Sequence, residues 1–105
     1  MKTFELLWLD LVRHLKPGLT IDNWTALRGN LGDQMTVVGI RDRYIEIGAP
    51  NAKSVQRVPK ADFEKVWEVW SDYKSQKLPR HKIRDMTLFS KYIISILRWY
   101  EQNVE

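Results

Sequence analysis

The segment from Tyr73 to Arg84, YKSQKLPRHKIR, carries five cationic side chains and one histidine and contains no acidic residue. Cations grouped in this way can each neutralise a phosphate of a nucleic acid, and the affinity they provide falls as the salt concentration rises. The residues expected to contact nucleic acid here are Lys74, Lys77, Arg80, His81, Lys82 and Arg84. A solvated connection between two helices has the same composition, and the sequence leaves that alternative open.

The residues that follow fit the spacing of a helix-turn-helix motif, with a short helix over 79–86, a turn over 87–89 and a second helix over 90–102. Thr87, or alternatively Ser90, would begin the second helix, where unpaired backbone N–H groups attract anions. The polar residues expected on the outer face of that helix are Lys91, Ser95 and Arg98. The turn lacks the glycine often found in this motif, and the second helix is apolar enough to be a core helix instead. Nucleic-acid binding, to DNA or RNA, is nevertheless the function that we expect.

An aromatic helix provides the alternative. The stretch FEKVWEVWSDY (63–73) has more apolar side chains than one buried face requires. Val69 and Tyr73 form a second line beside the apolar stripe that ends at Trp70. If the rest of the protein covers only the stripe, Val69, Trp70 and Tyr73 would contact a protein partner or a second copy. A competing interpretation is that the first helix of the chain covers this line. The alternative function is therefore a protein-interaction or regulatory module.

Enzymatic chemistry has little support in the sequence. The chain has no cysteine, which excludes thiolate nucleophiles, disulfides and zinc–thiolate sites. Asp10 and His14 are four residues apart on an expected helix, but no third metal ligand has suitable spacing. No serine lies in a G-x-S-x-G turn, and the glycines form no phosphate-binding loop. We expect no enzymatic activity, no metal and no cofactor.

Composition and charge predict a small globular protein. A chain of 105 residues with 44% hydrophobic residues suits one domain, residues 1–105. Six cations balance six acids in residues 1–52, whereas residues 53–105 have eleven cations and seven acids and so supply the whole net charge of +4. No segment resembles a secretion signal or a membrane span, so a cytoplasmic protein without a membrane partner is expected.

The periodicity of apolar residues predicts an α+β fold. Apolar residues at helical spacing indicate a first helix from about Thr3 to Lys16, which Pro17 and Gly18 end. Alternation and β-branched residues indicate strands over 35–40, 44–49 and 54–58, with a turn at Pro50 and Asn51 before the third strand. The glycine-containing stretch 29–32 is interpreted as a turn. Residues 20–27 fit either a short helix or a strand, and a strand is favoured.

Three helices are expected after the strands, over 60–77, 78–86 and 87–103. A small antiparallel sheet has an apolar face that must be covered, and these helices are the elements available to cover it. The predicted architecture is an N-terminal helix, a small antiparallel meander of three to four strands, and three C-terminal helices packed on the sheet.

Overall fold

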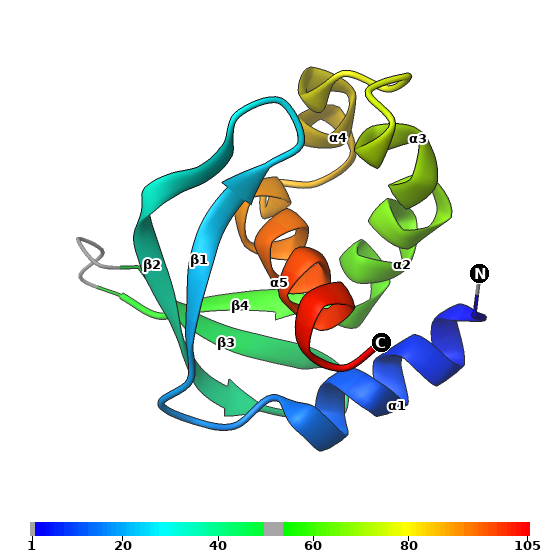
Figure 1. Cartoon of the computed structure of the whole chain (residues 1–105). Helices are drawn as coiled ribbons and strands as arrows, with labels where there is room; N and C mark the ends of the chain where they lie inside the picture. Colours follow the sequence, from blue (N-terminus) through cyan, green and yellow to red (C-terminus); the bar gives the residue numbers. More distant parts are fainter. Residues whose placement is uncertain (1, 50–53) are drawn as a thin grey trace.

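The computed structural model describes residues 2–49 and 54–105 of the chain. Within these residues, one helix is followed by four strands and then by four helices (Figure 1). The elements are α1 (Phe4–His14), β1 (Thr20–Thr25), β2 (Gly29–Ile40), β3 (Tyr44–Gly48), β4 (Gln56–Pro59), α2 (Lys60–Glu68), α3 (Trp70–Lys74), α4 (Arg80–Met86) and α5 (Ser90–Asn103). The predicted α+β class is confirmed. The turn expected at Pro50 and Asn51 lies outside the described residues.

The four strands form one antiparallel meander in the order β1-β2-β3-β4. Residues 20–27 are therefore mainly strand, as favoured from the sequence. Alternate residues of β3 are buried, including Ile45 and Ile47, so the period-2 pattern correctly identified the inner face of this strand. Between the pairs Asp22↔Gln34 and Trp24↔Asn30, β2 uses more residues than β1, and this bulge bends the sheet.

Helix α5 lies at the centre of the molecule, between the curved sheet on one side and α2 and α3 on the other (Figure 1). Its buried residues include Ile93, Ile94, Ile96, Leu97 and Tyr100, so apolar side chains point to several sides of the helix. A helix that is buried almost all round is a core element. The main core of the domain is therefore built around α5.

The first helix begins and ends where the sequence indicates. The Thr3 side chain accepts a hydrogen bond from the backbone N–H of Leu6, which caps α1. After the helix, Gly18 adopts a φ of 91°, a conformation that side-chain-bearing residues rarely adopt. Leu7, Trp8 and Leu11 are buried, as their helical spacing predicts.

Two local predictions are wrong. Residues 29–32 are not the turn between strands but the start of β2, because the turn is formed earlier, at residues 26–28. The single helix expected over 60–77 is divided at Val69, whose φ of −113° and ψ of 9° interrupt the helical backbone. The break lets Trp67 pack beside α1, where its Nε1–H donates to the carbonyl oxygen of Lys2, while Trp70 faces β1.

Candidate nucleic-acid interface

The basic segment 74–84 spans the end of α3, a connection and the first half of α4. Pro79 directly precedes α4, with a φ of −72°. The Lys74 ammonium pairs with Glu101 of α5, so this cation is already neutralised inside the domain. The other basic residues of the segment are the half-buried Arg80 and the exposed Lys77, His81, Lys82 and Arg84. None of these five has an acidic partner within 4 Å in the described part of the chain.

The connection between α4 and α5 has the predicted length, and α5 begins at Ser90. The Thr87 hydroxyl is engaged within the protein, however. The Thr87 hydroxyl donates to Asp62 of α2 at 2.6 Å and accepts from the Phe89 N–H at 3.0 Å. Thr87 and Ser90 are both buried. Neither residue is therefore placed on an exposed helix start, and that part of the prediction is wrong.

Ser95, at the middle of the expected outer face of α5, is covered by β1. Ser95 is only 1% exposed, and its hydroxyl accepts from the Trp24 N–H at 3.1 Å and donates to Asn23 at 3.4 Å. The Arg98 guanidinium lies over the Trp24 ring at 4.9 Å from its centre. Ser95 and Arg98 are therefore held against β1, and both also line a hollow of about 460 Å³ between α5 and the first two strands.

Lys91 belongs to the same junction, because its ammonium lies 3.7 Å from the carboxylate of Asp33 on β2. A hydrogen bond from the Asn23 side chain, together with the nearby Lys91, holds the pKa of the Asp33 carboxyl below its usual value. Ser95 is buried and Arg98 is half-buried, so these residues and Lys91 do not form the continuous exposed face that was predicted, although the Lys91 side chain is 40% exposed. Polar side chains can be buried at little cost when hydrogen bonds satisfy them, and the sheet provides those bonds.

The structure also changes the interpretation of the aromatic residues that were expected to contact a protein partner. Trp70 is fully buried and Tyr73 is 3% exposed, with their rings stacked 5.7 Å apart, while Val69 is half-buried. Trp24 of β1 packs against Trp70 at 6.3 Å between ring centres. The side chain that covers Trp70 therefore comes from strand β1 and not from the first helix. Val69, Trp70 and Tyr73 do not form an exposed aromatic patch, and the most exposed apolar side chains of a helix face are instead Leu6 and Leu9 on α1.

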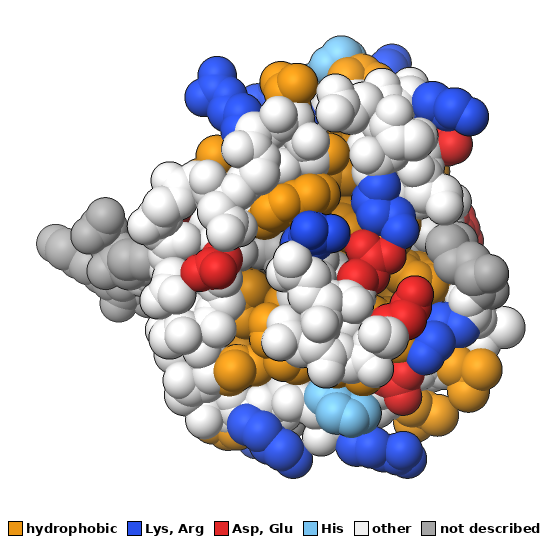
Figure 2. All heavy atoms as spheres, viewed as in Figure 1, with side chains coloured by type: hydrophobic (Ala, Val, Ile, Leu, Met, Phe, Trp, Pro, Cys, Tyr) orange, Lys and Arg blue, Asp and Glu red, His pale blue; other side chains and the backbone are white. Residues whose placement is uncertain are grey.

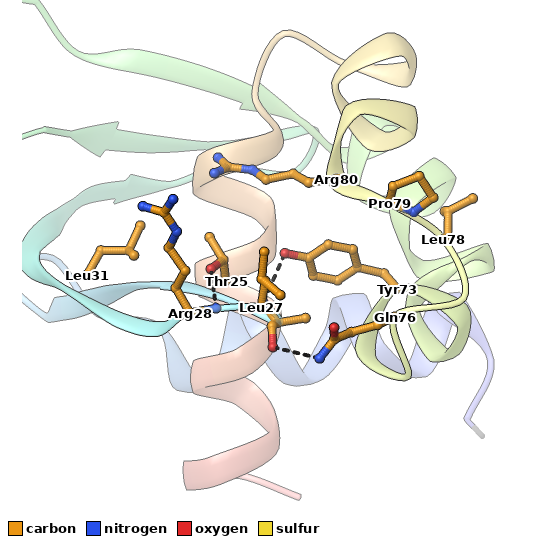
Figure 3. A pocket seen from close by; sticks show the side chains of 10 residues that line it. Thr25, Leu27, Arg28, Leu31, Tyr73, Gln76, Leu78, Pro79 and Arg80 are labelled. Carbon is orange, nitrogen blue, oxygen red and sulfur yellow. Dashed lines mark hydrogen bonds between the residues drawn. The ribbon is translucent and has the colours of Figure 1, made fainter.

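A cavity of about 360 Å³ lies between the β1–β2 turn and the α3–α4 connection (Figure 3). It is lined by Thr25, Ala26, Leu27, Arg28, Leu31, Tyr73, Gln76, Leu78, Pro79 and Arg80. Arg28 and Arg80 extend toward the same side of the cavity, and none of the described residues that line it is acidic. The basic segment therefore borders a concave site, to which the turn contributes a further cation.

Neither the role of Arg28 nor the cavity was predicted from the sequence. The available signal for an exposed apolar site was the pair of leucines beside the glycines in TALRGNLG (25–32). Apolar side chains in a turn have few neighbours to pack against. Only contacts between residues 25–31 and 73–80 create the concave surface, and no local pattern indicates that these two segments meet.

The surface charge around this site is mainly positive. Figure 2 shows Lys and Arg side chains along the upper edge of the molecule, near the tip of the β1–β2 turn and over the α3–α4 region. Arg28 has no acidic partner within 4 Å in the described residues. The Nε atom of Arg80 is covered by protein and has no hydrogen-bond partner among the described residues.

The Asp10–His14 pair has structural roles. The Asp10 carboxylate lies 2.6 Å from the Lys2 ammonium and accepts a hydrogen bond from the Tyr100 hydroxyl at 2.6 Å. These two hydrogen bonds hold the pKa of Asp10 below its usual value, whereas burial first, and then the bond to Asp10, raises the pKa of Tyr100. His14 Nδ1 lies 2.9 Å from the carbonyl oxygen of Asp10, at the end of α1.

No group of three or more potential ligands among the described residues could hold a metal ion. In the same part of the chain, every helix is too short or too polar to cross a bilayer. Comparisons of the chain with protein-family models, with curated proteins and with solved structures find no match. A functional proposal therefore depends on the geometry and charge of the surface itself.

Proposed function

We propose that this protein binds nucleic acid through a basic surface formed by Arg28 of the β1–β2 turn and by Lys77, Arg80, Lys82 and Arg84 of the α3–α4 region. The observation that carries the proposal is that cations from two distant segments border one cavity and lack acidic partners in the described residues. Cations held near one another without counter-charges repel, and a polyanion relieves that repulsion.

The proposed contacts are to phosphates, because Ser95 of α5 is buried against β1 and Arg98 lies over the Trp24 ring, so these side chains are not presented to base edges as on a recognition helix. Binding should therefore depend strongly on salt and weakly on sequence. If all five cations each neutralise one phosphate of duplex DNA, raising the salt from about 50 to 200 mM should weaken binding about 500-fold.

The test is a polarisation titration of a labelled mixed-sequence duplex with the wild-type protein and two triple variants. The first variant carries Lys77→Glu, Lys82→Glu and Arg84→Glu. The matched control carries Arg13→Glu, Lys16→Glu and Arg43→Glu, at exposed cations on and just after α1 and between β2 and β3, none of which lines the cavity. Each reversal changes the charge by two, so both variants go from +4 to −2.

The first variant should lose binding, and the slope of log affinity against log salt should fall by about 3 in magnitude. The control should keep the wild-type slope and lose only the smaller, long-range part of the attraction. If both variants lose affinity equally, net charge alone explains the effect. If the first variant binds nucleic acid like the wild type, the proposed surface is not the binding site.

The expected protein-interaction function receives less support, since Trp70 and Tyr73 are committed to the core. Their rings already have packing partners in Trp24 and in each other. An aromatic anchor at an interface must instead be accessible before the partner arrives.

A further inference from the structure

The cavity beside the basic surface has apolar walls on two sides. Leu27 and Leu31 come from the β1–β2 turn and the start of β2, while Leu78 and Pro79 come from the α3–α4 connection (Figure 3). Leu27 is 77% exposed and Leu31 is 39% exposed, so neither side chain is used fully by the core. A cavity of about 360 Å³ is within the range of small-ligand sites and is large enough for a nucleobase.

Hydrogen bonds between the two walls hold the cavity open. The Ala26 N–H donates to the Tyr73 hydroxyl at 3.1 Å, and the Gln76 amide donates to the Ala26 carbonyl oxygen at 3.4 Å. Within the turn, the Arg28 N–H donates to the Thr25 hydroxyl at 3.1 Å (Figure 3). A site fixed in this way loses little conformational entropy when a ligand binds.

Two arginines set the polarity of the cavity mouth. Arg28 and Arg80 come from opposite walls of the cavity. A planar guanidinium suits bidentate contact with a phosphate. The ligand that matches these features has a flat apolar part and an adjacent phosphate.

We propose that the cavity takes up one unpaired base of a bound nucleic acid, while Arg28 and Arg80 pair with the phosphates that flank that base. This inference rests on the proposed nucleic-acid binding and specifies its preferred form. A base inside a duplex is stacked and cannot enter a cavity, whereas an unpaired or extruded base can insert between apolar side chains. The phosphates beyond the base explain why the cationic surface continues past the cavity, which a small anionic ligand would not require.

The experiment compares three labelled DNA probes on the unaltered protein at one salt concentration. The first probe is a mixed-sequence duplex, the second carries one bulged 2-aminopurine, and the third carries a bulged abasic residue at the same place. The abasic probe reproduces the bend and charge of the bulge but lacks the base. We expect the 2-aminopurine bulge to bind about tenfold more tightly than the abasic bulge, which is the effect of one inserted base, with a change in 2-aminopurine emission.

Two variants locate the base. The double substitution Leu27→Ala and Leu31→Ala removes one apolar wall and keeps every charge, and circular dichroism checks that the variant is folded. Leu88→Ala is the matched control, because Leu88 is 93% exposed and does not line the cavity. The double variant should bind the base and abasic bulges equally, and the control should keep the tenfold preference.

The outcomes separate the two proposals. Wild-type protein that binds the duplex but does not distinguish base from abasic bulge overturns the base-binding inference and leaves nucleic-acid binding intact. Protein that binds none of the probes overturns both. A tenfold preference that survives in the folded double variant also overturns the inference, because the base would then be held elsewhere.

Discussion

The role of Ser95 distinguishes most sharply between an exposed recognition helix and a buried central helix. Its hydroxyl accepts the hydrogen bond of the Trp24 N–H and donates to Asn23, across 71 and 72 positions of the chain. The substitution Ser95→Ala removes this single oxygen and adds no volume. We expect the variant to be less stable and, once folded, to bind nucleic acid like the wild type.

The magnitude follows from the groups left without partners. The Trp24 N–H would remain buried beside α5 without an acceptor, which costs about 1–3 kcal/mol. Alanine has a better helix propensity than serine and returns up to about 0.5 kcal/mol. Asn23 keeps its hydrogen bond to Asp33 at 3.0 Å. The net loss in the free energy of unfolding should therefore be about 0.5–3 kcal/mol, or a fall of about 2–24 °C in Tm.

Urea denaturation and thermal melting measure this loss, with Gln102→Ala as the control on an exposed position of the same helix. The control should change the free energy of unfolding by less than about 0.5 kcal/mol. If Ser95→Ala keeps wild-type stability and weakens nucleic-acid binding, Ser95 faces the ligand, and the packing of β1 over α5 described above is refuted.

Two further predictions concern the core and the N-terminal contacts. Trp70→Ala should lower the free energy of unfolding by about 3–5 kcal/mol in urea titrations, because it empties a fully buried site between Trp24 and Tyr73. A variant that stays stable and only loses self-association in light scattering would instead support the hypothesis that Trp70 belongs to a protein interface. Asp10→Asn should destabilise the protein near pH 7 and make little difference in strong acid. The reason is that the lowered pKa of Asp10 stabilises the fold above the ordinary carboxyl pKa, and that contribution is lost as the pH falls through the lower folded-state pKa. Urea midpoints measured from pH 7 to pH 2 test this prediction, and a difference between wild type and variant that is independent of pH would contradict it.

The sequence by itself determined most of the elements and their inner faces. The first helix was predictable because Thr3 caps it and Pro17 and Gly18 end it, all within one short segment. The inner face of β3 was predictable because side chains alternate along a strand, which places Ile45 and Ile47 together. Such patterns are local, so they survive without knowledge of the rest of the fold.

Only the tertiary structure decided which polar and aromatic residues are exposed. The sequence shows that Ser95 and Arg98 are polar. Burying a polar side chain costs free energy, but such a side chain can still be buried when β1 supplies interaction partners for it. Trp70 and Tyr73 are apolar enough for either a core or an interface, and the position of Trp24 places them in the core.

The cavity illustrates the same limit for the candidate site. Arg28 and Arg80 are 52 positions apart, and nothing in either local sequence indicates that both line one concave surface. They are brought to one cavity by the packing of the β1–β2 turn against the end of α3, where hydrogen bonds run from Ala26 to Tyr73 and from Gln76 to Ala26. The cations of the basic segment could thus be identified from sequence, whereas the surface that they border is a product of long-range packing.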